Sequence, residues 1–265
     1  MVELYNDVSK DIEEGYLFLN KLESIFSEIQ NNYLRLKDTK KILKRGGIDE
    51  TTFATVRNEI LENTCRRFIE YMDILSNAEN VLTKLKVVYT KMILEIEKYR
   101  KGQKSVYVRR ADEFMMLTSR AKMLKQNIDK LAEKIENIDV DLAFFLLESF
   151  TEKANELHYL DYTPRIVEFA KKIGDKWSEE RMRLESRLSD MEKEIEKINE
   201  ELEELEIRYS IGEFDRIVYD EKRIKLENKR QKLEENIKEL ENKLEENDSF
   251  FLKIFEKLEL LQSKT

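Results

Sequence analysis

Histidine and cysteine each occur once in this 265-residue chain, and no residues stand at the spacing that a catalytic or metal site requires. His158 is the only histidine, and its neighbours Glu156 and Asp161 do not form the i, i+4 ligand pair of a zinc-binding helix. We therefore expect a surface or interface histidine. Gly46-Gly47 lacks the Lys and Ser or Thr of a phosphate-binding loop, so helix termination accounts for it. The sequence predicts no enzymatic activity, no cofactor, no metal and no small-molecule substrate.

Cys65 is the only cysteine, and it directly precedes Arg66 and Arg67. Neighbouring cations lower the pKa of a thiol and make it reactive. However, no second cysteine and no histidine stands nearby in sequence to act as a resolving group or base, which favours a structural thiol on a helix. A lone cysteine cannot form an internal disulfide, and no secretory signal precedes it, so we expect a reducing, cytoplasmic compartment.

The elements that hold these residues are predicted to be long α-helices. Apolar residues recur three and four positions apart along nearly the whole chain, most regularly over 75–99 and 184–209. This spacing keeps one seam of a helix against a partner helix. Charged residues make up 39% of the chain, which has only six glycines and one proline, so little of it can form sheets and loops. We predict an all-α fold: an elongated antiparallel coiled coil, with a three-helix rod followed by a helical hairpin.

The rod is predicted to occupy residues 1–160. Its first helix runs over about 3–44 and ends at Arg45-Gly46-Gly47, where glycine suits the left-handed position after a helix. Asp49 or Thr51 then caps a second helix that extends to about Tyr99. A break at 102–105 precedes a third helix that ends near Ile138, so successive helices are antiparallel.

The hairpin is predicted to occupy residues 161–265. Before it, six consecutive apolar residues at 142–147 belong to a short helix that Asp139 or Asp141 caps, and that is covered on both faces. Thr163-Pro164 begins the hairpin, because proline favours the first position of a helix. Gly174-Asp175 either interrupts this helix or lies within it, and both alternatives are open. The turn between the two helices is at 209–215.

The first candidate binding surface is a basic turn. The net charge of the chain is −8, yet residues 98–110 hold six cations and no acid. This candidate anion-binding tip consists of Lys98, Arg100, Lys101, Lys104, Arg109 and Arg110. A second basic stretch lies at 35–45. Such turns could contact phosphates of nucleic acid or of a lipid surface. Alternatively the cations only complement helix dipoles, which leaves Arg109 and Arg110 unexplained.

The second candidate surface is aromatic. Two segments carry more apolar side chains than a two-helix seam requires, and their candidate self-association residues are Phe144, Phe145, Phe250, Phe251 and Phe255. These side chains either cover one another within a chain or form an interface between copies. We expect a homo-oligomer, with a dimer favoured, and a protein partner.

One segment has a family resemblance. Residues 205–215, followed by Tyr219-Asp220-Glu221-Lys222-Arg223, form a helix, a Gly-Glu turn and a second helix. Over about 205–245 this pattern resembles the coiled-coil part of archaeal Cdv-type cell-division scaffold proteins, although this chain lacks their β-rich N-terminal domain. The resemblance implies a membrane-linked scaffold. The Lys/Glu/Ile-rich composition also resembles that of hyperthermophile proteins.

These observations lead to two functional hypotheses. The first is a non-enzymatic, cytoplasmic and archaeal coiled-coil scaffold that self-associates and engages a membrane-linked, filament or protein partner, in cell division or membrane remodelling. The alternative is a nucleic-acid-associated coiled-coil protein that binds phosphates through the basic hairpin tip.

Overall fold

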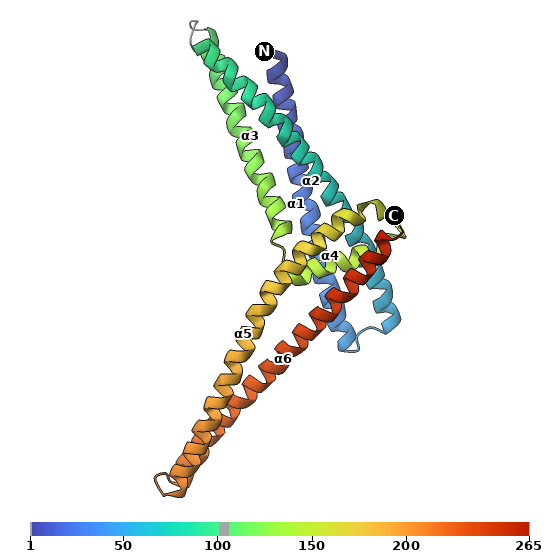
Figure 1. The fold of residues 1–265 in the computed structure, drawn as a ribbon. Coiled ribbons are helices and arrows are strands. Elements are labelled where there is room, and N and C mark those ends of the chain that lie inside the picture. Colours follow the sequence, from blue (N-terminus) through green and yellow to red (C-terminus); the bar gives the residue numbers. More distant parts are fainter. Residues whose placement is uncertain (1, 101–105, 265) are drawn as a thin grey trace. The chain divides into compact units, whose positions relative to one another are not determined.

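The structure is a computed structural model that describes residues 2–100 and 106–264, with side chains described for 8–87, 90, 116–135 and 137–264. The predicted all-α class is confirmed (Figure 1). The elements are α1 (Val2–Lys44), α2 (Glu50–Arg100), α3 (Val106–Glu136), α4 (Val140–Lys153), a 3₁₀ turn (Leu160–Tyr162), α5 (Thr163–Ser210) and α6 (Arg216–Gln262). They divide into two compact units, with the boundary between Pro164 and Arg165 rather than at the expected 160/161.

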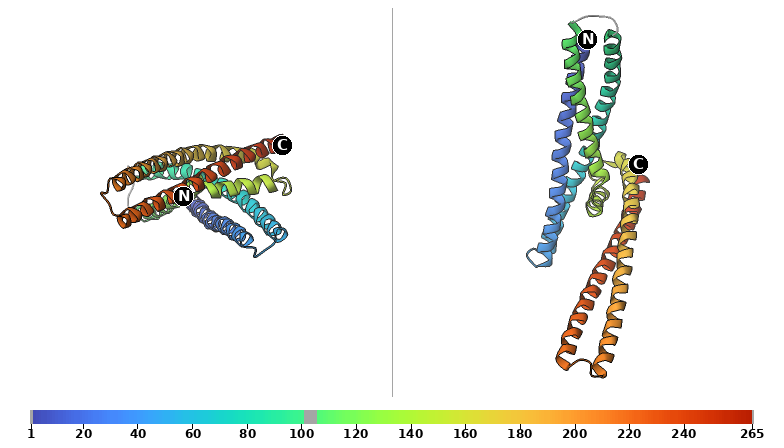
Figure 2. Two further views of the ribbon diagram at one scale, coloured as in Figure 1. Left: turned by 90° about the horizontal axis from the view of Figure 1, so that it is seen from below. Right: turned by 90° about the vertical axis from the view of Figure 1, so that its left-hand side faces the viewer.

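The N-terminal unit is built from three long antiparallel helices and the short helix α4. The right-hand view of Figure 2 shows α1, α2 and α3 side by side, and α4 packs mainly against α2. Their apolar stripes form the core, in which the fully buried side chains include Ile12, Leu22, Ile29, Leu61, Phe68, Tyr71, Leu124, Ile128 and Phe150. The hydroxyl of Tyr71 donates a hydrogen bond of 2.9 Å to the carbonyl of Leu131, which ties α2 to α3 inside this core.

Aspartates cap three of the helices at their N-termini. Oδ1 of Asp49 accepts a 2.6 Å hydrogen bond from the amide of Thr52, and Oδ1 of Asp139 accepts one of 2.9 Å from the amide of Asp141. Asp215 caps α6 in the same way. The bonds from the amide and hydroxyl groups that follow Asp49 lower the pKa of its carboxyl group. The caps of α2 and α4 are therefore Asp49 and Asp139, rather than Thr51 and Asp141.

The same backbone arrangement occurs directly after α1 and α5 and in the turn that follows α4. After α1, Gly46 has φ 71°, and the amide of Gly47 bonds back to the carbonyl of Ile42. After α5, Gly212 has φ 81° and the following amide bonds five residues back in the same way. This is the Schellman motif, in which glycine normally takes the left-handed position. In the turn of residues 154–158 that follows α4, His158 takes that position with φ 59°, and the amide of Tyr159 bonds to the carbonyl of Ala154.

The C-terminal unit is the hairpin of α5 and α6. Helix α5 is continuous through Gly174, and the ring of Phe251 on α6 occupies the space that a side chain at 174 would fill. Near one end of the hairpin, Nε1 of Trp177 donates a 2.8 Å hydrogen bond to Asp248. Near the turn, the rings of Tyr209 and Tyr219 stack with their centroids 4.2 Å apart. The two helices are therefore fixed in one register from end to end.

Candidate interaction site

The predicted anion-binding tip lies outside the described side chains. Helix α2 ends at Arg100 and α3 begins at Val106, while residues 101–105 are outside the described structure. The side chains of the six cations, Lys98, Arg100, Lys101, Lys104, Arg109 and Arg110, are all among those not described. Phosphate binding at this turn stays a prediction.

The second basic stretch is described, at the end of α1. The ammonium of Lys37 lies 3.5 Å from the hydroxyl of Tyr33, a hydrogen bond that raises the pKa of Lys37. Lys41 pairs with Asp38 at 3.1 Å. The remaining four cations of this stretch are exposed: Arg35, Lys40, Lys44 and Arg45. Cations thus line the end of α1, while Asp49 and Glu50 place acidic side chains at the start of α2 on the other side of the turn.

The aromatic residues of α4 are not an exposed surface. Phe144 and Phe145 are buried, with 5% and 4% of their area accessible, and the ring of Phe145 lies 5.6 Å from that of Tyr33. A self-association role for these two residues does not fit this burial. The six-residue apolar run is instead part of a helix buried all round.

The aromatic residues of α6 are half-buried. Phe251 packs on Gly174, and its ring meets that of Phe255 edge to face at 4.7 Å. Phe250 is half-buried as well, while Ile254 and Leu258 are buried. Phe251 therefore has a role within the hairpin itself, which weakens the expectation that it serves contact between copies.

The surroundings of Cys65 and His158 do not indicate a reactive site. Cys65 is fully buried, and burial raises the pKa of its thiol to about 12, an effect that outweighs the nearby charge of Arg66. His158 is exposed at the end of α4. Within the part of the chain whose side chains are described, no group of three acidic, cysteine or histidine side chains could hold a metal ion.

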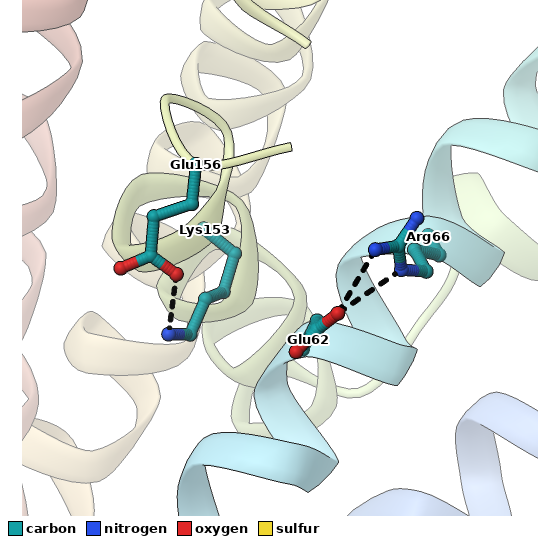
Figure 3. A network of polar contacts seen from close by, with 4 residues as sticks. All are labelled: Glu62, Arg66, Lys153 and Glu156. Atoms are coloured by element: carbon teal, nitrogen blue, oxygen red, sulfur yellow. Dashed lines mark hydrogen bonds and ion pairs between the residues drawn. The ribbon is translucent and has the colours of Figure 1, made fainter. Parts of the chain in front are cut away.

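Charged side chains near Cys65 pair with one another. Figure 3 shows Arg66 bonded to Glu62 one turn away on α2, at 2.9 Å, and Lys153 bonded to Glu156, also at 2.9 Å. The side chain of Lys153 is only 6% exposed, whereas its partner Glu156 faces solvent. Exposed pairs such as Arg66–Glu62 contribute little to stability, and each of these two cations already has an acidic partner three or four residues away.

The hairpin follows a heptad pattern that assigns every side chain to a place around the helix. Positions a and d form the seam, and positions e and g flank it on opposite sides. The a positions of α5 include the half-buried residues Leu188, Ile195 and Leu202, and the d positions of α6 include the half-buried residues Leu226, Leu233 and Leu240. The hairpin therefore has two edges, which we name the g edge and the e edge.

The g edge carries opposite charges on its two helices. On α6 its g and c positions from 222 to 232 form a lysine rim of Lys222, Lys225, Lys229 and Lys232. On α5 the c and g positions from 190 to 204 form a carboxylate rim of Asp190, Glu194, Glu201 and Glu204, which Lys197 interrupts and which has Arg187 and Arg208 at the neighbouring g positions. Nζ of Lys229 pairs with Glu194 across the seam at 2.8 Å, which raises the pKa of Lys229. This ion pair confirms that the g positions of the two helices share one edge.

The e edge carries acid on both helices. Its e positions include Glu185, Glu192 and Glu206 on α5, with Asp220, Glu227 and Glu234 on α6. Arginines at a positions neutralise some of these carboxylates: Arg223 bonds to Glu227 at 2.9 Å, and Arg230 lies 3.5 Å from Glu234. Sequence reasoning missed this asymmetry, although the signal is present in the residue types at e and g.

Comparison with known proteins adds no functional assignment. No protein-family model matches this chain, and neither a curated protein nor a solved structure matches it. Among the described helices, none has an apolar stretch of the length needed to cross a bilayer.

Proposed function

We propose that this protein is a non-enzymatic coiled-coil scaffold that self-associates and engages a protein, filament or membrane-linked partner. One observation carries the proposal: α5 and α6 form a continuous arm whose register is fixed along its length by Trp177–Asp248, Lys229–Glu194 and Tyr209–Tyr219. At about 1.5 Å per residue, a helix of 47 residues extends roughly 70 Å. An arm of this length holds binding surfaces at fixed separations.

The exposed side chains of the arm support a role in association. Large apolar residues face solvent near its turn: Ile207, Ile211, Ile217 and Ile224 are each more than half exposed. Isolated exposed apolar residues are ordinary, but four isoleucines within 18 residues of a charged coiled coil favour a contact surface. Cell division or membrane remodelling is the setting that the Cdv-type resemblance implies.

Isotope-mixed cross-linking tests self-association. Equal amounts of unlabelled and ¹⁵N-labelled chain are mixed, equilibrated and treated with a short amine-reactive or carboxylate-to-amine cross-linker. We expect peptide pairs that join one labelled and one unlabelled chain, with the hairpin residues prominent among them. If every cross-link joins peptides of the same isotope at micromolar protein, the chain is a monomer and the proposal fails.

A second function is favoured by one specific observation, the cations that line the end of α1. Arg35, Lys40, Lys44 and Arg45 are exposed on one helix end, where phosphate oxygens could be contacted. Titration with anionic liposomes, duplex DNA and single-stranded RNA at one fixed salt concentration separates a membrane scaffold from a nucleic-acid-binding protein. Reversal of Lys40, Lys44 and Arg45 to Glu should abolish whichever binding is found, and reversal of Lys101, Arg109 and Arg110 tests the other turn.

A further inference from the structure

We propose that the partner of the g edge is the g edge of a second copy of this chain, with the lysine rim of each hairpin against the carboxylate rim of the other. This inference rests on the proposed self-association and names the surface that performs it. A twofold axis places identical patches against each other, so the patch must be complementary to itself. A patch with one positive rim and one negative rim meets that condition.

The charges of the g edge are only partly used within one chain. In the described structure the ion pair across this edge is Lys229 with Glu194. Lys225 and Lys232 are exposed and have no ion-pair partner among the described side chains. On the other rim Glu201 is also exposed, and its charge raises the pKa of Lys229 less than that of Glu194 does. Asp190 lies 3.8 Å from Lys193, and Glu204 bonds to Arg208 at 3.2 Å, each on its own helix. Lys225, Lys232 and Glu201 are therefore the charges of both signs that are available to another molecule.

The e edge cannot serve in the same way. Its carboxylates lie on both helices, so a twofold pairing of e edges would bring like charges together. Arg223 and Arg230, which could have compensated, already contact Glu227 and Glu234 on their own helix. Of the two edges, only the g edge attracts its own copy. The same repulsion would keep the dimer from adding further copies through the e edge.

Apolar side chains along the g edge would add buried apolar area to the pairing of the charged rims. The d positions of the seam lie next to the g positions, and Met191, Leu226 and Leu233 are only half-buried there. Close to the turn, Ile211 stands at a c position on the same edge with 72% of its area exposed. A second hairpin would cover these side chains, while the charged rims would set orientation and register.

A charge-exchange experiment tests this surface. One full-length variant carries Lys225→Glu and Lys232→Glu, and a second carries Asp190→Lys and Glu201→Lys. All four positions are exposed, so both variants should keep the helical circular dichroism of the wild type. We expect each variant alone to dimerise at least tenfold more weakly than the wild type, because its two rims then approach the same sign. An equimolar mixture should recover the wild-type dimer mass by light scattering, with one copy of each variant.

A matched control places the same chemistry away from the g edge. Glu200→Lys and Glu235→Lys change outward f positions and should leave the dimer mass unchanged. If both g-edge variants dimerise as the wild type does, or if the mixture fails to recover the dimer, this surface is wrong. A wild type that is itself monomeric would instead overturn the proposed self-association, so the two failures are distinguishable.

Discussion

The ring of Phe251 lies so close to Gly174 that a Cβ atom at residue 174 would come within 2.6 Å of Cζ of Phe251. The surface of α5 thus lacks a side chain at Gly174, and the ring of Phe251 on α6 fills that space. Phe255 packs edge to face on the same ring and restricts its movement. This contact explains why a glycine stands within a continuous helix, where it costs about 1 kcal/mol relative to alanine.

Replacement of this glycine should therefore lower stability. Gly174→Ala gains helix propensity of about 1 kcal/mol but forces the Phe251 ring to move, at a cost of about 1–3 kcal/mol. We expect a net loss of about 1 kcal/mol in the free energy of unfolding, measured by urea denaturation followed by circular dichroism. In a Phe251→Ala background the same change should raise stability, since only propensity then acts. A stabilising effect in the wild-type background would contradict the contact.

Removal of the His158 side chain should raise stability. A left-handed conformation costs a residue with a Cβ atom about 1–2 kcal/mol, and part of the gain is offset by the greater freedom of glycine in the unfolded chain. We expect His158→Gly to add about 0.5–1 kcal/mol to the free energy of unfolding. Gly212→Ala is the matched control, because nothing lies within 4 Å of its Cβ position and only the backbone is strained. It should destabilise by a similar amount. A loss of stability in His158→Gly would mean that the imidazole makes a stabilising contact.

The sequence was sufficient for the fold class and for most helix ends, because both depend on local signals. Heptad spacing predicts the long helices, and the aspartates at 49, 139 and 215 stand directly before them. The continuity of α5 through Gly174 could not be predicted, since glycine suits both a helix end and a close contact, and the side chain that packs on it, Phe251, is 77 residues away. Likewise no local pattern predicts a left-handed histidine at 158.

The candidate site was predictable only in part. Aromatic residues such as Phe144 and Phe145 are typical of both protein cores and interfaces. Which of the two they form depends on the helices that pack around them, and here they are buried in the core. The charge of the two hairpin edges, in contrast, could have been read from positions e and g once the turn at Gly212 was identified. The anion-binding tip at 98–110 stays a prediction.

Cys65 should be protected from thiol reagents in the folded protein. Burial raises the pKa of its thiol from 9.0 to about 12, so at pH 8 the folded chain contains almost no thiolate. The buried sulfur is also out of reach of a reagent in solution. Because the folded state holds this proton more tightly than the unfolded state, stability should fall as pH rises from 9 toward 12. Tyr71, whose pKa is also raised by burial, should act in the same direction.

Labelling with a chromogenic disulfide reagent at pH 8 measures this protection. We expect the rate to follow the opening of the N-terminal unit and to rise steeply in urea. Fast stoichiometric labelling in native buffer would show that the thiol is accessible.

Sedimentation equilibrium of the full-length wild-type chain tests the central claim, self-association through charge-complementary hairpins, most directly. The chain mass is 31.9 kDa. At low ionic strength and micromolar concentration we expect twice this mass, and a monomer fraction that grows as salt is raised to about 1 M, where the screening length is about 3 Å. A single species of 31.9 kDa at every protein and salt concentration would contradict the account.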